Sequence, residues 1–135
     1  MKPRPHVVCL CGSTRFYELF QQYNFQRTML GQIVLSVGFY PHADAFAGRQ
    51  LHGEDVGVTA EQKQQLDELH KRKIDLADEV LILNKDGYIG NSTRGELMYA
   101  WRHGKEITFL EPQKAPRLFY TLDQPHDIIG IEMQF

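Results

Sequence analysis

The chain has 135 residues, of which 42% are hydrophobic and 24% are charged, and its formal net charge is −2. This composition is typical of a soluble globular domain long enough for an apolar core, and the small charge gives no electrostatic attraction for nucleic acid or an anionic membrane. No apolar run approaches the roughly 20 residues of a membrane-spanning helix, and the N-terminus lacks the apolar stretch of a signal peptide. We therefore expect a cytoplasmic protein without nucleic-acid or membrane partners.

The N-terminal part of the chain predicts a strand, a tight turn and a helix. The run from His6 to Cys11 is apolar at almost every position, which is typical of a central parallel strand. Gly12 ends this strand, and Ser13 or Thr14 can cap the helix that follows. Apolar residues at helical spacing give that helix a buried face before Gly31 ends it, namely Phe16, Leu19, Phe20, Tyr23 and Leu30.

The middle of the chain contains a long segment without a regular pattern. Residues 33–37 predict the second strand, and residues 39–59 then carry a proline and several glycines. A loop of this length in a small domain is usually functional, so we interpret it as a lid or one wall of a pocket. A helix over residues 60–77 follows, with an inward face made of Leu66, Leu69, Ile74 and Ala77.

The remaining elements complete an alternating α/β pattern. They are a strand over 79–83, a turn over 87–96 with a helix to residue 103, a strand over 106–110, and a C-terminal extension over 112–135 with one helical turn and a fifth strand or docked tail. Because parallel strands need helical crossovers, this order predicts a single Rossmann- or flavodoxin-like domain. We expect a three-layer sandwich whose mostly parallel sheet has four to five strands.

Two polar turns fall at the carboxyl ends of the predicted strands, where ligands bind in this architecture. The first, Gly12-Ser13-Thr14-Arg15, combines a glycine, two hydroxyls, a helix N-terminus and an arginine. These are the parts of a phosphate-binding turn. The turn is neither a Walker loop nor a full dinucleotide fingerprint, so an ordinary strand–helix turn with a serine cap is an equal alternative.

The second turn leads from the third strand into the last helix. Gly90, Asn91, Ser92 and Thr93 bring backbone N–H groups and small polar side chains to the start of that helix. We place Glu96 in its first turn, where the carboxylate could act as nucleophile or general base. The alternative is structural, because Thr93 and Glu96 have the spacing of a capping box.

Other ionisable residues have weaker functional interpretations. Asp67, Lys71 and Asp75 follow one another at a spacing of four residues, which an exposed charge ladder explains. His70 is expected to be packed or half-exposed, whereas His42 follows the second strand and is better placed to touch a ligand. A site from His42, Asp44 and His52 matches no known metal-binding spacing, so we expect no metal and no cofactor.

The two cysteines, Cys9 and Cys11, share a face of the first predicted strand. Two residues this close along one strand cannot form an unstrained disulfide, and the chain has no second cysteine pair for a zinc site. We expect them to pack in the sheet as small apolar residues.

The chain resembles the nucleoside 2-deoxyribosyltransferase-like superfamily, which includes the 2′-deoxynucleoside 5′-phosphate N-hydrolases. The resemblance covers residues 7–110 and begins with the G-S-x-R turn after the first strand, here Gly12, Ser13 and Arg15. It continues with Ala77-Asp78 at the start of a hydrophobic strand. It ends with E-x-x-Y-A-x-x-x-G-K, here residues 96–105.

This resemblance implies cleavage or transfer of an N-glycosidic bond. The family glutamate that matches Glu96 attacks the anomeric carbon, following the logic of retaining glycosyl transfer. The G-S-x-R turn implies a site for the 5′-phosphate of a nucleotide. We further expect Asn91 or Ser92 to hold the sugar, and Tyr40 and His42 to face the base.

The chain also departs from the family pattern. An aspartate usually stands about eight residues before the one that matches Asp78, where this chain has His70, and an acidic or polar residue is usual where it has Gly90. We expect Asp75, or alternatively Asp67, to supply the missing carboxylate, and Asn91 or Ser92 to replace the polar residue. The alternatives are a nucleotide-sensing module without turnover, and a phosphoribohydrolase of the lysine-decarboxylase-like type.

The resemblance has a consequence for assembly as well. Members of the superfamily are commonly dimers or larger, with pockets completed by a neighbouring subunit. We therefore expect a homodimer or higher homo-oligomer, formed through exposed aromatic residues such as Tyr99 and Trp101 on the last helix.

Overall fold

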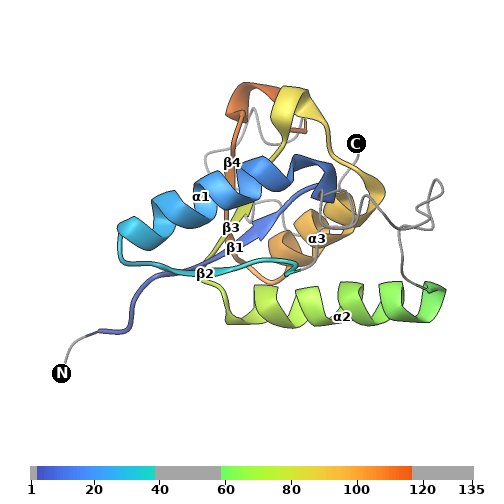
Figure 1. Ribbon diagram of the computed structural model, residues 1–135, viewed down its shortest axis with the longest axis horizontal. Helices are drawn as coiled ribbons and strands as arrows, with labels where there is room; N and C mark the ends of the chain where they lie inside the picture. The colour runs from blue at the N-terminus through green and yellow to red at the C-terminus, as the bar shows by residue number, and fades with distance from the viewer. Residues whose placement is uncertain (1–2, 39–58, 117–135) are drawn as a thin grey trace.

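The computed structural model describes residues 3–38 and 59–116. The predicted lid at 39–58 and the C-terminal extension beyond residue 116 therefore lie outside the described residues. The described elements form an α/β fold (Figure 1): β1 (Val7–Cys11), α1 (Tyr17–Met29), β2 (Ile33–Leu35), α2 (Ala60–Leu76), β3 (Glu79–Ile82), α3 (Asn91–Arg102) and β4 (Glu106–Phe109). Short 3-10 helices follow three of the strands, namely η1 (Thr14–Phe16), η3 (Lys85–Gly87) and η4 (Pro112–Lys114).

The four strands form one parallel sheet in the order β2-β1-β3-β4. The chain adds β2 on one side of β1 and then crosses over to add β3 on the other side. The carboxyl ends of β1 and β3 lie side by side, since Cys11 pairs with Ile82. In a doubly wound sheet this change of direction opens the crevice in which ligands bind. The predicted flavodoxin-like α/β sandwich is thereby confirmed.

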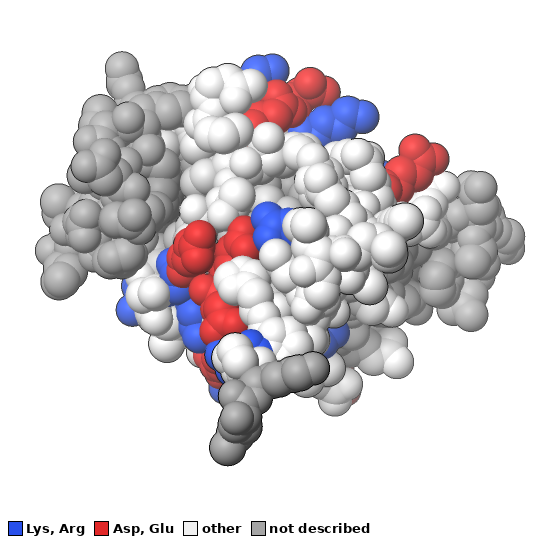
Figure 2. Space-filling model, turned by 90° about the vertical axis from the view of Figure 1, so that its left-hand side faces the viewer, with Lys and Arg blue, Asp and Glu red and all other residues white. Residues whose placement is uncertain are grey.

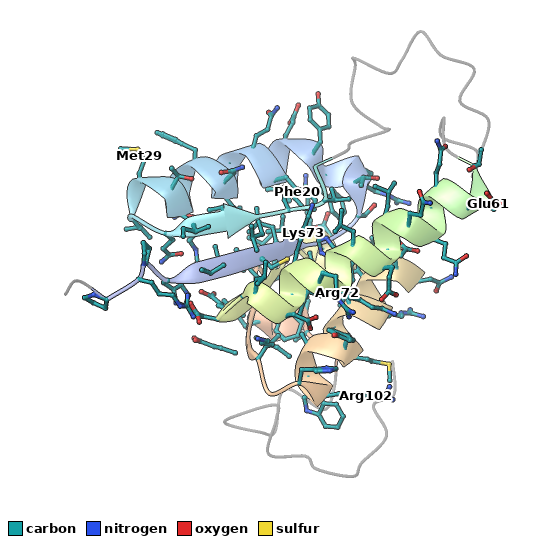
Figure 3. All side chains as sticks on the ribbon, turned by 90° about the horizontal axis from the view of Figure 1, so that it is seen from below. Phe20, Met29, Glu61, Arg72, Lys73 and Arg102 are labelled. Carbon is teal, nitrogen blue, oxygen red and sulfur yellow. The ribbon has the colours of Figure 1, made fainter. Side chains whose placement is uncertain are left out.

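The two faces of the sheet are covered by different helices. Alternate residues of β1 point to opposite faces. Val8 and Leu10 pack with Phe20 of α1 on one face (Figure 3). Cys9 and Cys11 face the other side, where α2 and α3 supply a second apolar cluster. All residues of β1 and β3 are buried, which explains why both strands read as continuous apolar runs in the sequence.

The helices differ from the sequence prediction in their ends and in one buried face. Residues 14–16 form a 3-10 turn, so α1 begins only at Tyr17, and Ser13 caps that turn instead. Leu30 is 67% exposed because it lies just beyond the end of α1, and Leu69 is 53% exposed. On α2 the inward positions are His70 and Ile74, one turn apart. This phase turns Leu69 outward.

Charged side chains gather at the edge of the sheet where the strands begin, opposite the carboxyl ends of β1 and β3 (Figure 2). Glu79 at the start of β3 is buried and accepts hydrogen bonds from Arg27 at 2.8 and 3.0 Å. Asp78 pairs with Arg4 and accepts a hydrogen bond from the backbone of Val7. These carboxylates hold the sheet edge and are separate from the predicted site. Within the described ranges, no helix is both long and apolar enough to cross a membrane.

Candidate functional site

Glu96 lies in the second turn of α3, not in the first as the sequence predicts. Gly90 is the N-cap of this helix in an extended conformation, and no side chain caps it. Thr93 is inside the helix and 3% exposed, so the alternative in which Thr93 and Glu96 form a capping box is wrong. The carboxylate is therefore available for another purpose, and 16% of its side chain remains exposed.

The Glu96 carboxylate belongs to a cluster of four side chains, Cys9, Cys11, His70 and Glu96. Nε2 of His70 lies 3.7 Å from Oε2 of Glu96, 3.2 Å from Sγ of Cys11 and 3.7 Å from Sγ of Cys9. The thiol of Cys11 is also within hydrogen-bonding reach of the Glu96 carboxylate. Both cysteines are free thiols and are fully buried. The cluster therefore links the carboxyl end of β1 to α2 and α3, the two helices that cover this face of the sheet.

Local structure explains why these four side chains meet. Cys9 and Cys11 occupy alternate positions of β1, so both point toward α2 and α3. His70 precedes Ile74 by one helical turn, and Glu96 precedes Ala100 by one turn. Because Ile74 and Ala100 are fully buried on this face of the sheet, the residues one turn earlier also face it.

The burial of the cluster shifts its ionisation. Removal from water raises the pKa of Glu96 to about 7, against the attraction of the neighbouring His70. Burial by itself would lower the pKa of His70, but its hydrogen bond with Cys9 and the charge of Glu96 outweigh burial, and the net pKa is raised. The hydrogen bond with Cys11 lowers the pKa of Cys9 to about 6, whereas burial raises that of Cys11. A proton exchanged within this cluster changes the charge of Glu96.

Two buried polar atoms of the cluster have no hydrogen-bond partner in the described part of the chain. They are Nδ1 of His70 and Oε2 of Glu96. Buried polar atoms are nearly always paired, and exceptions are often functional. The carboxylate is thus held in place by packing and by charge, with one oxygen uncommitted.

The predicted phosphate turn lies directly after the cluster. Gly12 follows Cys11, and a Cβ atom at this position would meet the Leu83 side chain, just after β3, at 3.1 Å, so a larger residue would require that side chain to shift by a few tenths of an ångström. Ser13 caps η1 by accepting a hydrogen bond from the backbone of Arg15 at 3.3 Å. Thr14 begins η1 and is half-buried. The turn is therefore anchored to β3 at its start, and its arginine is exposed.

Arg15 connects this turn to the loop before α3. Its Nη2 donates a hydrogen bond to Oη of Tyr88 at 3.1 Å, and its Cζ lies 4.2 Å from the centre of the tyrosine ring. Gly90 lies next to the same ring, since a Cβ atom there would meet Oη of Tyr88 at 3.3 Å. The two polar turns predicted from the sequence thus lie side by side in the structure.

The start of α3 carries the residues expected to hold a sugar. Asn91 and Ser92 are exposed, and Lys63 of α2 donates a hydrogen bond to Oγ of Ser92 at 3.2 Å. Thr93 is buried beneath them. The first N–H groups of α3 receive no side-chain cap, which leaves a favourable position for an anionic or polar ligand.

The structure does not bring Asp75 to this cluster. Its carboxylate accepts a hydrogen bond from the Tyr99 hydroxyl at 2.5 Å and pairs with Arg72 at 3.0 Å. Its backbone carbonyl accepts a hydrogen bond from Lys105, which precedes β4 at the amino-terminal edge of the sheet. The contacts of Asp75 are therefore with the α2–α3 surface and not with Glu96.

Three further expectations have different outcomes. Tyr40 and His42 lie outside the described residues. Tyr99 and Trp101, which the sequence suggests as exposed dimer contacts, are half-buried and pack against the core. The expected homodimer therefore stays a prediction without the support of these two side chains.

Cys9, Cys11 and His70 were not predicted to belong to a functional site. The sequence contains one indication of it, because the two cysteines occupy alternate positions of the strand that leads into the Gly12 turn and therefore share a face. His70 lies one turn before Ile74, the most deeply buried residue of α2. A histidine on an inward helix face opposite two thiols on one strand face indicates a cluster, but only once the helix is known to cover that face.

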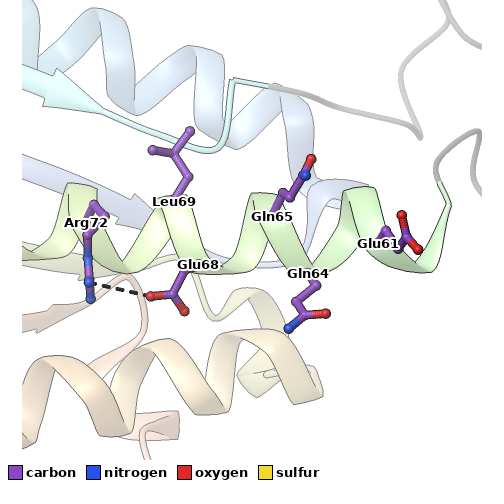
Figure 4. A pocket seen from close by; sticks show the side chains of 6 residues that line it. All are labelled: Glu61, Gln64, Gln65, Glu68, Leu69 and Arg72. Atoms are coloured by element: carbon purple, nitrogen blue, oxygen red, sulfur yellow. Dashed lines mark ion pairs between the residues drawn. The ribbon is translucent and has the colours of Figure 1, made fainter.

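A shallow groove on the outer side of α2 lies apart from this cluster (Figure 4). It is lined by one stripe of the helix, namely Glu61, Gln64, Gln65, Glu68, Leu69 and Arg72. None of the four cluster residues lines it. We therefore locate the candidate site at the carboxyl ends of β1 and β3, and not in this groove.

Comparisons with known proteins give no family assignment. No model of a known protein family matches the chain, and neither a curated protein nor a solved structure matches it. The candidate site therefore has to be interpreted from its own residues.

Ionisation of Glu96 predicts a pH-dependent stability. The folded chain keeps the Glu96 proton up to a pKa of about 7, whereas the unfolded chain releases it near 4.5. Wild type should therefore lose stability relative to Glu96→Gln as the pH rises from about 5 to about 8. Urea unfolding across this range, with EDTA present to exclude metal, measures the difference. Glu68→Gln serves as a control that removes an exposed carboxylate, and a difference that stays constant with pH for Glu96→Gln would contradict the prediction.

Proposed function

We propose that this chain cleaves or transfers the N-glycosidic bond of a nucleoside 5′-monophosphate or a related nucleotide, with Glu96 as the nucleophile. The observation that carries the proposal is the position of the Glu96 carboxylate. It is largely buried beside His70, with one uncommitted oxygen, next to the turn that carries Arg15. The resemblance of the sequence to the nucleoside 2-deoxyribosyltransferase-like superfamily points to the same residue.

His70 supports the first requirement, which is an ionised nucleophile. Burial holds the proton on Glu96, but the pKa of His70 is raised beside it. When His70 carries the proton, the carboxylate is charged and stabilised by the adjacent imidazolium at 3.7 Å. His70 therefore acts as a positioning residue that sets the charge of Glu96 near neutral pH.

The reaction then proceeds in two balanced steps. A Glu96 oxygen forms a bond to C1′ of the sugar while the C1′–N bond breaks, and the departing base takes the bonding electron pair and a proton from water. Water then attacks C1′ of the glycosyl ester and frees the Glu96 carboxylate, or a second base attacks in its place and gives transfer. No metal or cofactor enters either step.

The two turns supply binding for the rest of the nucleotide. The Arg15 guanidinium is exposed and positioned by Tyr88, so that it can form paired hydrogen bonds with a 5′-phosphate. Asn91 and Ser92 offer polar side chains for the sugar hydroxyls at the start of α3. Ser92 precedes Glu96 by one helical turn, and Arg15 contacts Tyr88 in the loop before α3. Phosphate binding at Arg15 would then orient C1′ toward the carboxylate.

A nucleotide-sensing module without turnover is the second candidate function. The position of Asp75 favours it, because this carboxylate hydrogen-bonds Tyr99 instead of joining Glu96. A departing base would then lack the acid that the sequence led us to expect. Both candidates share the same ligand class and differ in whether product forms.

Release of free base tests the catalytic proposal. We expect wild type to release base from at least one member of a panel of ribo- and deoxyribonucleoside 5′-monophosphates, as measured by chromatography. Loss of an activated nucleophile should lower the rate for Glu96→Gln by at least about 100-fold. Glu68→Gln, on the exposed face of α2, should keep the wild-type rate. A folded Glu96→Gln variant with the wild-type rate would contradict the assignment, and binding of nucleotides without release would favour the sensing module.

The role of Arg15 gives a separate prediction. Arg15→Met should raise KM for the nucleoside 5′-monophosphate about 10- to 100-fold, with little change in kcat. This factor corresponds to the binding free energy lost with charged hydrogen bonds to the phosphate. The corresponding nucleoside without phosphate should be turned over equally well by both forms. Steady-state kinetics on the pair of substrates measures this, and Arg102→Met at the exposed end of α3 is the matched control. Equal losses for nucleotide and nucleoside would show that Arg15 does not contact the phosphate.

A further inference from the structure

We propose that Cys9, Cys11 and His70 form a binding site for a thiophilic metal ion, with Zn²⁺ as the preferred ion and Glu96 at the fourth position. The three ligand atoms Sγ, Sγ and Nε2 all lie within 4.8 Å of one another, and all three residues are buried. No other residues of the described ranges bring three potential ligands of this kind together.

The spacing of the ligand atoms fits a tetrahedral ion. Zinc bonds of about 2.3 Å to sulfur and about 2.0 Å to nitrogen or oxygen place neighbouring ligand atoms about 3.3–3.8 Å apart. Here Nε2 of His70 lies 3.7 Å from Cys9 Sγ and 3.2 Å from Cys11 Sγ. It lies 3.7 Å from Glu96 Oε2. The two sulfurs also lie within 4.8 Å of each other, so the three atoms can close around an ion with side-chain shifts of up to about 1 Å. Glu96 is not within this distance of all three, so its carboxylate has to turn toward the ion to take the fourth position.

The Glu96 oxygen provides independent support for the fourth position. Oε2 is buried and has no hydrogen-bond partner in the described part of the chain. It faces the histidine nitrogen that also contacts both sulfurs. Coordination would satisfy this atom, and a set of two thiolates, one imidazole and one carboxylate is a donor combination that zinc accepts.

Charge balance also favours a divalent cation in this position. Zinc binding releases to water the protons that Cys9, Cys11 and Glu96 still carry. The two thiolates then neutralise the ion, and the Glu96 carboxylate leaves one negative charge in excess. A buried group of two thiolates and a carboxylate is costly without a cation, and a divalent ion removes most of that charge. The ligands also come from regular elements, since β1 is an inner strand of the sheet and α2 packs across it (Figure 3). The site is thus largely formed before the ion arrives.

Metal binding and the proposed catalytic reaction share Glu96, but they can be tested separately. Metal binding can be measured without substrate, so a chain that binds zinc and releases no base would support this inference and contradict the other. If both hold, zinc and substrate compete, because an ion bound to Oε2 occupies the oxygen that attacks C1′.

Titration of the untagged, reduced, metal-free chain with Co²⁺ tests the site. We expect a single Co²⁺ per chain, with thiolate charge-transfer absorption and the strong visible bands of a tetrahedral ion, and displacement by Zn²⁺. Zn²⁺ should also raise the thermal unfolding midpoint. Cys11→Ala and His70→Gln should weaken Zn²⁺ binding by more than about 100-fold, since loss of even an outer-shell partner costs about 10- to 100-fold. His103→Gln, an exposed histidine on the end of α3, is the matched control and should bind as wild type does.

Two results would overturn the inference. The first is Co²⁺ binding without thiolate absorption, which would place the ion on other histidines. The second is unchanged binding in folded Cys11→Ala or His70→Gln. Should these variants fail to fold, the wild type alone decides the question, because the chain has only two cysteines. Zn²⁺ should then slow the reaction of both thiols with a thiol reagent at least about tenfold, as expected for coordinated sulfur, and equal rates would exclude the site.

Discussion

The candidate site depends on one contact, in which the Glu96 carboxylate packs against the face of β1 that α2 and α3 cover. A carboxylate is normally kept at the surface, because its charge is costly to bury. Here it lies against two thiols and an imidazole, and burial raises its pKa to about 7. Among the described glutamates near the carboxyl edge of the sheet, only Glu96 bears this cost. It lies in the second turn of α3, beside Cys11 and His70.

The topology of the sheet explains why this contact occurs where ligands are expected. The chain changes direction between β1 and β3, and in a doubly wound sheet this is the position beyond the carboxyl ends of the strands where ligands bind. Arg15 and Tyr88 join the loops that follow these two strands. The ion pairs of Glu79 and Asp78 stabilise the opposite edge, which leaves the carboxyl edge free for polar groups that the fold itself does not need.

The sequence was sufficient to predict the elements but not the contacts between them. Apolar runs and glycine stops located all four strands to within two residues, because buried parallel strands carry a strong signal. The position of Glu96 on its helix was wrong, since Gly90 starts α3 earlier than a threonine cap would. The convergence of Cys9, Cys11 and His70 could not be predicted, because residues about 60 positions apart meet only through the packing of α2 on β1.

Detection of a covalent sugar on Glu96 tests the central claim most directly. The chain would be mixed with the best nucleotide substrate, quenched in acid within the first turnover and digested for mass spectrometry. The account predicts that the peptide containing Glu96 gains the mass of one sugar phosphate, and that the same peptide from Glu96→Gln does not. Release of base with this peptide unmodified, or a sugar attached to another residue, would contradict it.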